Sequence, residues 1–194
     1  MGRIEVPRAW MMPRMRAYLS RAGYFARVSD VAAEILETAR SVYLEALDLA
    51  CPFAATVDVA RTEPGLPLPE PLAATERVSL IVCTLGIGID RAVEAMFARD
   101  ESLRGLLLDA WASEAVEAIA ANVDERLRDD HGPGTMRFAP GYPPFDIRHN
   151  RAWLACLERH LGSSTPVTVD SGTGILTPRK SILCAIGWKG RMER

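Results

Sequence analysis

The segment Arg-Phe-Ala-Pro-Gly-Tyr, from Arg137 to Tyr142, brings a cation and an aromatic hydroxyl together on a short stretch of chain. Pro140 fixes its own φ and favours an extended Ala139, whereas Gly141 tolerates φ values that other residues avoid. Two more prolines follow directly, so we predict a stiff loop. The guanidinium of Arg137 suits a carboxylate or phosphate ligand. The segment is a candidate binding loop; the alternative is a structural turn with Tyr142 packed on the core.

A second candidate is Glu114, which lies within a long helix predicted over residues 101–127. Helical spacing places it in the middle of an apolar stripe. The stripe comprises Leu103, Leu107, Ala110, Ala118 and Ala121. A carboxylate there needs a cation or several donors, because burying an unpaired charge is costly. The alternative is a partly exposed glutamate on a helix whose two sides are both moderately apolar.

The sequence does not predict metal or disulfide chemistry. The cysteines show no C-x-x-C pair, and we identify no ligand-like spacing between them and the histidines. The residues concerned are Cys51, Cys83, Cys156, Cys184, His131, His149 and His160. We therefore expect no metal site, and reduced thiols in a cytoplasmic protein.

Length and charge limit the possible classes of protein. A chain of 194 residues predicts one domain, and a net charge of −2 provides no field to recruit nucleic acid or anionic lipid. The longest apolar run, 78–89, is too short to span a bilayer. Residues 1–28 hold six arginines and one acid, so we predict a basic arm with a short helix, solvated or in contact with a partner rather than a transit peptide, followed by one domain over 29–194.

The elements that must position these residues can be predicted from local patterns. We expect a helix from residue 29 to 51, a strand over 53–60 and a buried strand over 78–85. Gly86-Ile-Gly88 then opens a helix, but Arg91 replaces the third glycine of a dinucleotide-binding turn. A helix over 150–161 and strands at 167–169 and 182–188 complete the chain. This order predicts an α+β fold with a largely antiparallel sheet.

Together these residues resemble the S-adenosylmethionine-binding activation, or reactivation, domain of cobalamin-dependent methionine synthase, and its stand-alone bacterial relatives. The strings that carry the resemblance are Arg137-x-x-Pro-Gly-Tyr142, Thr84-Leu-Gly86, Ser113-Glu114-Ala115 and Pro178-Arg-Lys-Ser181. The first reproduces the R-x-x-x-G-Y signature of the family. The resemblance runs from about residue 16 to 188 and implies a single α+β domain with a twisted, mainly antiparallel sheet.

The resemblance implies a binding site for S-adenosylmethionine. It places Arg137, Ala139, Gly141 and Tyr142 at this cofactor, with Arg137 a partner for its carboxylate. Glu114 corresponds to a family acid near the ammonium group; a shift of one residue in the alignment would move that role to Ser113. No side-chain nucleophile is needed, because the sulfonium already activates the methyl group and the protein mainly positions it.

The resemblance also implies partners. In the family, the domain presents S-adenosylmethionine to an oxidised cobalamin while a flavodoxin-type donor supplies an electron. This chain has no D-x-H-x-x-G string, so cobalamin is expected only in trans, on a corrinoid-binding methyltransferase protein. The chain is shorter than the family's domain and lacks an evident counterpart of its N-terminal portion. Two alternatives remain: a non-catalytic interaction module that lost the ligand, and an S-adenosylmethionine enzyme with another substrate.

Overall fold

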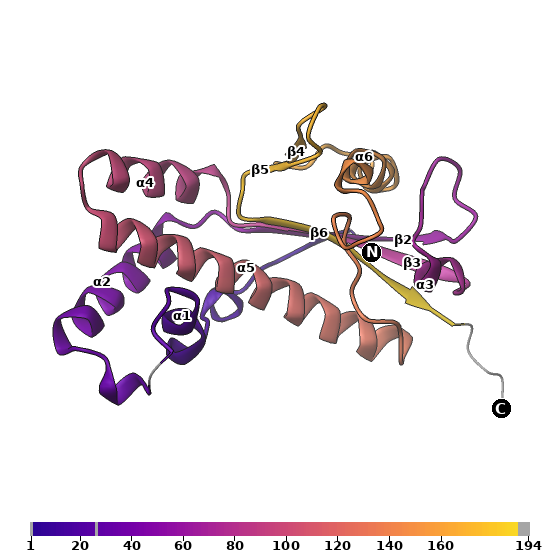
Figure 1. Cartoon of the computed structure of the whole chain (residues 1–194). Helices are drawn as coiled ribbons and strands as arrows, with labels where there is room; N and C mark the ends of the chain where they lie inside the picture. The colour runs from indigo at the N-terminus through magenta and orange to yellow at the C-terminus, as the bar shows by residue number, and fades with distance from the viewer. Residues whose placement is uncertain (1, 26, 190–194) are drawn as a thin grey trace.

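The computed structural model describes residues 2–25 and 27–189, which form an α+β fold (Figure 1). The strands are β1 (Gly2–Ile4), β2 (Phe53–Ala60), β3 (Arg77–Thr84), β4 (Thr168–Val169), β5 (Leu176–Thr177) and β6 (Ser181–Trp188). The helices are α1 (Met15–Arg21), α2 (Ala33–Leu49), α3 (Glu70–Ala73), α4 (Ile87–Ala98), α5 (Ser102–His131) and α6 (Asn150–Leu161). Short 3-10 turns are η1 (Arg8–Met11), η2 (Val28–Asp30) and η3 (Ile147–His149).

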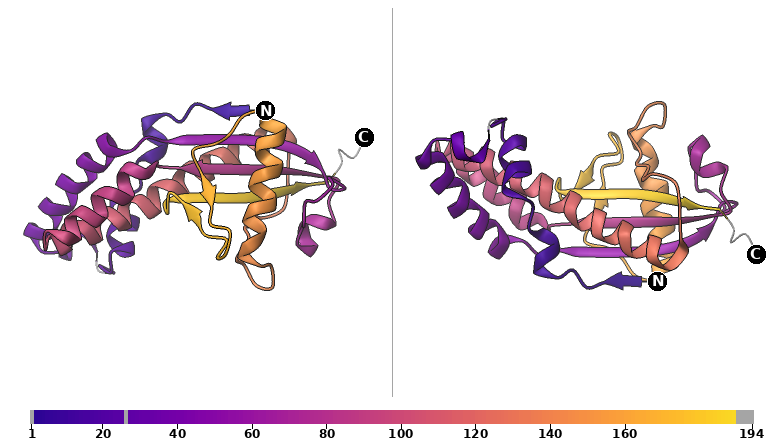
Figure 2. Two further views of the ribbon diagram at one scale, coloured as in Figure 1. Left: turned by 90° about the horizontal axis from the view of Figure 1, so that it is seen from above. Right: turned by 90° about the horizontal axis from the view of Figure 1, so that it is seen from below.

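The main sheet is antiparallel, with the strand order β1-β2-β3-β6, and β4 and β5 form a separate small sheet. This confirms the predicted α+β class. The strand β3, in the interior of the main sheet, is a largely apolar run that is buried on both faces. Side chains of a strand point alternately to the two faces, so Ile81 packs into the core shared with α5, whereas Leu80 packs into the core shared with α6. The helices α5 and α6 therefore cover opposite faces of the sheet (Figure 2).

The buried face of α5 differs from the predicted apolar stripe. Leu107 and Ala110 are buried as predicted, but Trp111 and Ile119, outside the stripe, are also fully buried, and Leu103 is 37% exposed. The helices α1, α2 and α4 pack against α5 in addition to the sheet, so it is covered on several sides. An alanine-rich helix covered in this way has no unique apolar stripe. The helix also continues to His131, four residues beyond the predicted end at residue 127.

The N-terminal segment packs against the rest of the chain, which corrects the prediction of a solvated arm. β1 pairs with β2, and Tyr18 and Leu19 on the short helix α1 are 0% and 1% exposed. Both side chains belong to the core around α5. The arginines of α1 lie on its outer side, where Arg21 pairs with an acid of α5. Among the described residues, no helix has both the length and the apolar composition needed to cross a membrane.

Candidate functional site

The segment before the Arg137 loop runs alongside β6, which determines where Arg137 points. Phe138 N donates to Ala185 O at 2.9 Å, and Ala185 N donates to Phe138 O at 2.7 Å. Successive residues of an extended segment point to opposite faces. Phe138 packs with the core shared with α6, so Arg137 points to the other face, where α5 lies.

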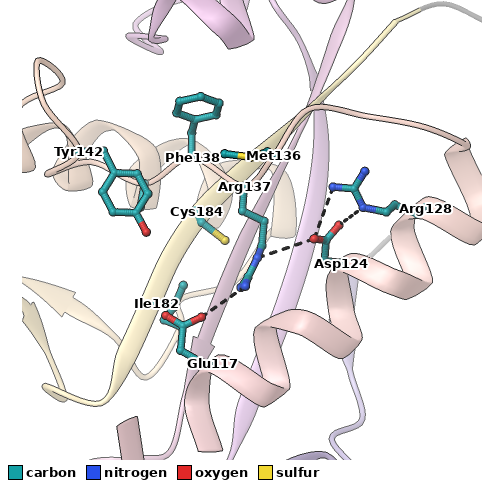
Figure 3. A pocket seen from close by; sticks show the side chains of 10 residues that line it. Glu117, Asp124, Arg128, Met136, Arg137, Phe138, Tyr142, Ile182 and Cys184 are labelled. Atoms are coloured by element: carbon teal, nitrogen blue, oxygen red, sulfur yellow. Dashed lines mark hydrogen bonds and ion pairs between the residues drawn. The ribbon is translucent and has the colours of Figure 1, made fainter. Parts of the chain in front are cut away.

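Arg137 lies between two carboxylates of α5 (Figure 3). Its Nη2 is 3.3 Å from Glu117 Oε2, and its Nε is 3.7 Å from Asp124 Oδ2. Glu117 and Asp124 are seven positions apart, about two helical turns, so they project from the same side of α5. The side chain of Arg137 is 27% exposed and that of Glu117 is 50% exposed. The outer ion pair is therefore within reach of a ligand from solvent.

A second arginine fixes the spacing between the helix and the loop. Arg128 Nε donates to Asp124 Oδ1 at 2.6 Å, and Arg128 Nη2 donates to the backbone oxygen of Thr135 at 2.7 Å. Arg128 Nη1 also donates to Gly134 O at 3.3 Å. Asp124 thus contacts both arginines, and Arg128 joins α5 to the backbone just before Arg137. This arrangement holds the guanidinium of Arg137 in place on its inner side.

The end of the loop is a tight turn that exposes Tyr142. Gly141 has a φ of 101°, a conformation that favours glycine, and its N–H donates to Phe145 O at 2.9 Å. Phe145 N donates back to Tyr142 O at 2.7 Å. The side chain of Tyr142 is 58% exposed and lies across the hollow from Asp124 and Arg128 (Figure 3). The structure therefore differs from the alternative in which Tyr142 packs on the core.

These side chains surround a hollow of about 330 Å³. Its lining consists of Glu117, Asp124, Arg128, Met136, Arg137, Phe138, Ala139, Tyr142, Ile182 and Cys184. A second hollow of about 450 Å³ shares Glu117, Ala139, Tyr142 and Ile182 with it, so the two adjoin. Both volumes are in the range of small-molecule sites. Charged groups of both signs lie along α5, and apolar or aromatic groups face them, which suits a ligand with a zwitterionic end and a flat ring.

The structure brings most of the predicted site residues together. Arg137, Ala139 and Tyr142 line the hollow, and Gly141 forms the turn between them. Glu114 is placed elsewhere: its Oε1 is 2.7 Å from Arg21 Nε, and it does not line either hollow beside Arg137.

Glu114 and Arg137 therefore do not line the same hollow in this structure. Glu114 precedes Glu117 by three residues, which turns its side chain by about 60° around the helix, toward α1. The alternative residue Ser113 accepts a hydrogen bond from Lys180 Nζ at 2.9 Å and also lies outside the lining.

Sequence reasoning missed Glu117 and Asp124, the two acids that contact Arg137. Their seven-residue spacing on a long helix was a usable signal, because it places both on one face. The sequence does not show whether the Arg137 loop meets this face of α5 or the face that carries Glu114. The position of the loop decides this, and that position follows from its pairing with β6.

Cys184 forms part of the inner wall of the hollow. It is 2% exposed, and burial raises the pKa of its thiol to about 12, although the nearby Arg137 acts in the opposite direction. The residue therefore remains a neutral thiol and contributes an apolar surface next to the charged groups.

Comparison with known proteins supports the fold assignment. No protein-family model matches the sequence, and no curated protein matches it significantly. The structure is similar to the crystal structure of the MetH reactivation domain bound to AdoHcy, with a TM-score of 0.69. The alignment covers 100% of this chain and 79% of that chain, at 14% sequence identity. The chain thus has the α+β fold of a methionine synthase reactivation domain.

Proposed function

We propose that this protein binds S-adenosylmethionine in the hollow beside Arg137 and acts as an accessory protein in reductive methylation of a cobalamin. The corrinoid is carried by a separate methyltransferase protein, and a flavodoxin-type donor supplies the electron. The observation that carries the proposal is the Arg137–Tyr142 loop facing two acids, within a fold shared with a reactivation domain bound to AdoHcy. A protein with this role works in the cytoplasm.

Binding of the amino-acid end of the ligand is an exchange of ion pairs. Without ligand, Arg137 pairs with Glu117, whose side chain is half exposed. A zwitterion placed between them presents its carboxylate to Arg137 and its ammonium to Glu117, so both protein charges keep a partner of opposite sign. Asp124 continues to hold Arg137 from the inner side.

The remaining lining residues bind the rest of the ligand. The exposed ring of Tyr142 provides an aromatic face for the adenine, and Ile182 provides apolar contact. S-adenosylmethionine supplies an activated methyl group when bound. The protein's own contribution is to fix the position of that group at the open rim, where a partner's cofactor can reach it.

Calorimetric titration of the full chain with S-adenosylmethionine and with S-adenosylhomocysteine tests this proposal. We expect saturable binding of both, and at least a tenfold weaker affinity for Arg137→Ala, because the ligand carboxylate loses its charged partner (about 2–5 kcal/mol). Arg8→Ala is the matched control, since Arg8 is an exposed arginine that pairs with Asp48 on the surface. If no saturable binding heat is measured up to millimolar ligand, the assignment of S-adenosylmethionine as the cofactor is overturned.

A second candidate is a non-catalytic interaction module that kept the fold and lost the ligand. The observation in its favour is that Arg137 already has two acidic partners within the chain. This candidate predicts that Arg137→Ala leaves partner binding and activity in cells unchanged. Loss of activity in cells by a variant that remains folded would exclude it.

A further inference from the structure

A group of three possible metal ligands lies outside the hollow beside Arg137. Cys156 and His160 are four positions apart on α6, and Glu63 comes from the loop after β2. One donor atom from each residue, a sulfur, an imidazole nitrogen and a carboxylate oxygen, lies within 4.8 Å of the other two. None of the three lines the hollows described above.

The spacing of these atoms is close to that of a formed zinc site. The Nε2 of His160 is already 3.1 Å from Glu63 Oε1. Tetrahedral Zn²⁺ at bond lengths of about 2.0–2.3 Å places its donor atoms about 3.3–3.6 Å apart. The donor atoms lie within 4.8 Å of one another, so the most distant pair would approach by at most about 1.2–1.5 Å to complete this geometry.

The chemistry of the group also suits such an ion. A thiolate and a carboxylate neutralise a divalent cation, and this combination with an imidazole is a ligand set that zinc prefers. Within the described part of the chain, Arg159 and His160 both contact Oε1 of Glu63, so an ion bound between this oxygen and His160 would replace the direct contact with His160. Arg159, at 2.7 Å, then acts as an outer partner that orients the carboxylate.

Access to the site is from the surface. Cys156 is 2% exposed and forms the floor, whereas the side chain of His160 is 36% exposed and that of Glu63 is 16% exposed. A cation can therefore approach past His160. The fourth coordination position is left for solvent.

We propose that Glu63, Cys156 and His160 form a binding site for Zn²⁺ that joins the loop between β2 and α3 to α6. This revises the expectation of no metal site. The spacing of four between Cys156 and His160 places both on one face of a helix and is the signal for this site in the sequence. Glu63 is distant from this pair in the sequence, and only the fold brings it beside Cys156 and His160.

Titration of the reduced full-chain protein with Co²⁺ tests the site, because a thiolate bound to Co²⁺ gives a charge-transfer absorption in the near ultraviolet. We expect a band that saturates at one equivalent and that Cys156→Ser removes. His160→Gln should weaken the affinity at least about tenfold, the scale of losing a ligand or its outer partner. Cys51→Ser and His149→Gln are the matched controls, since both alter residues outside the group, and both should keep the band.

A thermal measurement guards against misfolded variants. Zn²⁺ should raise the melting temperature of the parent protein and of Cys51→Ser, and should raise that of His160→Gln by less at the same Zn²⁺ concentration, since the altered side chain is partly exposed and leaves the core intact. A parent protein that gives no stoichiometric Co²⁺ band would overturn the proposal, as would a band that survives both Cys156→Ser and His160→Gln. Either result leaves the binding of S-adenosylmethionine untouched.

Discussion

At the scale of single residues, two neighbouring acids of α5 have different partners. Glu114 contacts Arg21 of α1, whereas Glu117 contacts Arg137 of the binding loop. Both are glutamates of the same helix, one turn apart. They differ in which arginine the fold brings to them, and this difference can be tested directly.

We expect Glu117→Gln to weaken S-adenosylmethionine about tenfold, because the ligand ammonium loses its charged partner in a site that is only partly desolvated. Glu114→Gln is the matched control and should change the affinity less than twofold, since its carboxylate faces α1. Calorimetric titration of both variants measures the difference. The reverse result, with Glu114→Gln the weaker binder, would return Glu114 to the site.

At the scale of elements, the turn between β4 and β5 is pressed against η3. Gly174 has a φ of 77°, and a Cβ there would lie 2.7 Å from Arg148 Cα and 2.8 Å from Arg148 N. The side chain of Asn150 at the start of α6 donates to Gly174 O at 3.0 Å. A backbone neighbour cannot move aside as a flexible side chain can, so this contact fixes the turn on the start of α6.

Gly162, at the end of α6, provides a matched comparison. Its φ is 72°, but a Cβ there has no neighbour within 4 Å. We expect Gly162→Ala to lower the free energy of unfolding by about 1 kcal/mol, from left-handed strain alone. Gly174→Ala should cost about 1–3 kcal/mol more, from the added overlap. Urea unfolding of both variants checks this, and equal losses would contradict the close packing of the turn.

At the scale of the whole molecule, the buried thiols of the sheet make stability depend on alkaline pH. Cys83 and Cys184 lie on the neighbouring strands β3 and β6, and burial raises the pKa of both thiols, to about 12 for Cys184. The ordinary value is 9.0. A group whose pKa is raised on folding contributes stability below its unfolded pKa and loses it as the pH rises toward the folded value.

We therefore expect the free energy of unfolding to fall by about 1–2 kcal/mol per buried thiol between about pH 8 and about pH 10.5. Cys184→Ala should reduce this dependence on pH, even though the smaller side chain lowers stability at every pH. Cys51→Ser, at the exposed cysteine, should leave the slope unchanged. Urea unfolding at the two pH values measures it, and an equal slope for Cys184→Ala would show that this thiol does not titrate on unfolding.

Local patterns in the sequence were sufficient for much of the fold. The strand predicted over 53–60 and the helix predicted over 150–161 coincide with β2 and α6. Apolar alternation, helical spacing and the proline and glycine stops act over a few residues, so they can be read without the rest of the chain. The Arg137–Tyr142 loop was recognised for the same reason.

The tertiary structure decided what depends on distant parts of the chain meeting. It pairs β1 with β2 and packs α1 on the core, brings Glu117 rather than Glu114 to Arg137, and places Glu63 beside Cys156 and His160. The first depends on an apolar side of α1 that its arginines obscure in the sequence. The contact between Glu117 and Arg137 and the position of Glu63 depend on which face of a helix a loop meets. Strand pairing and core packing determine that face, and the helix itself does not.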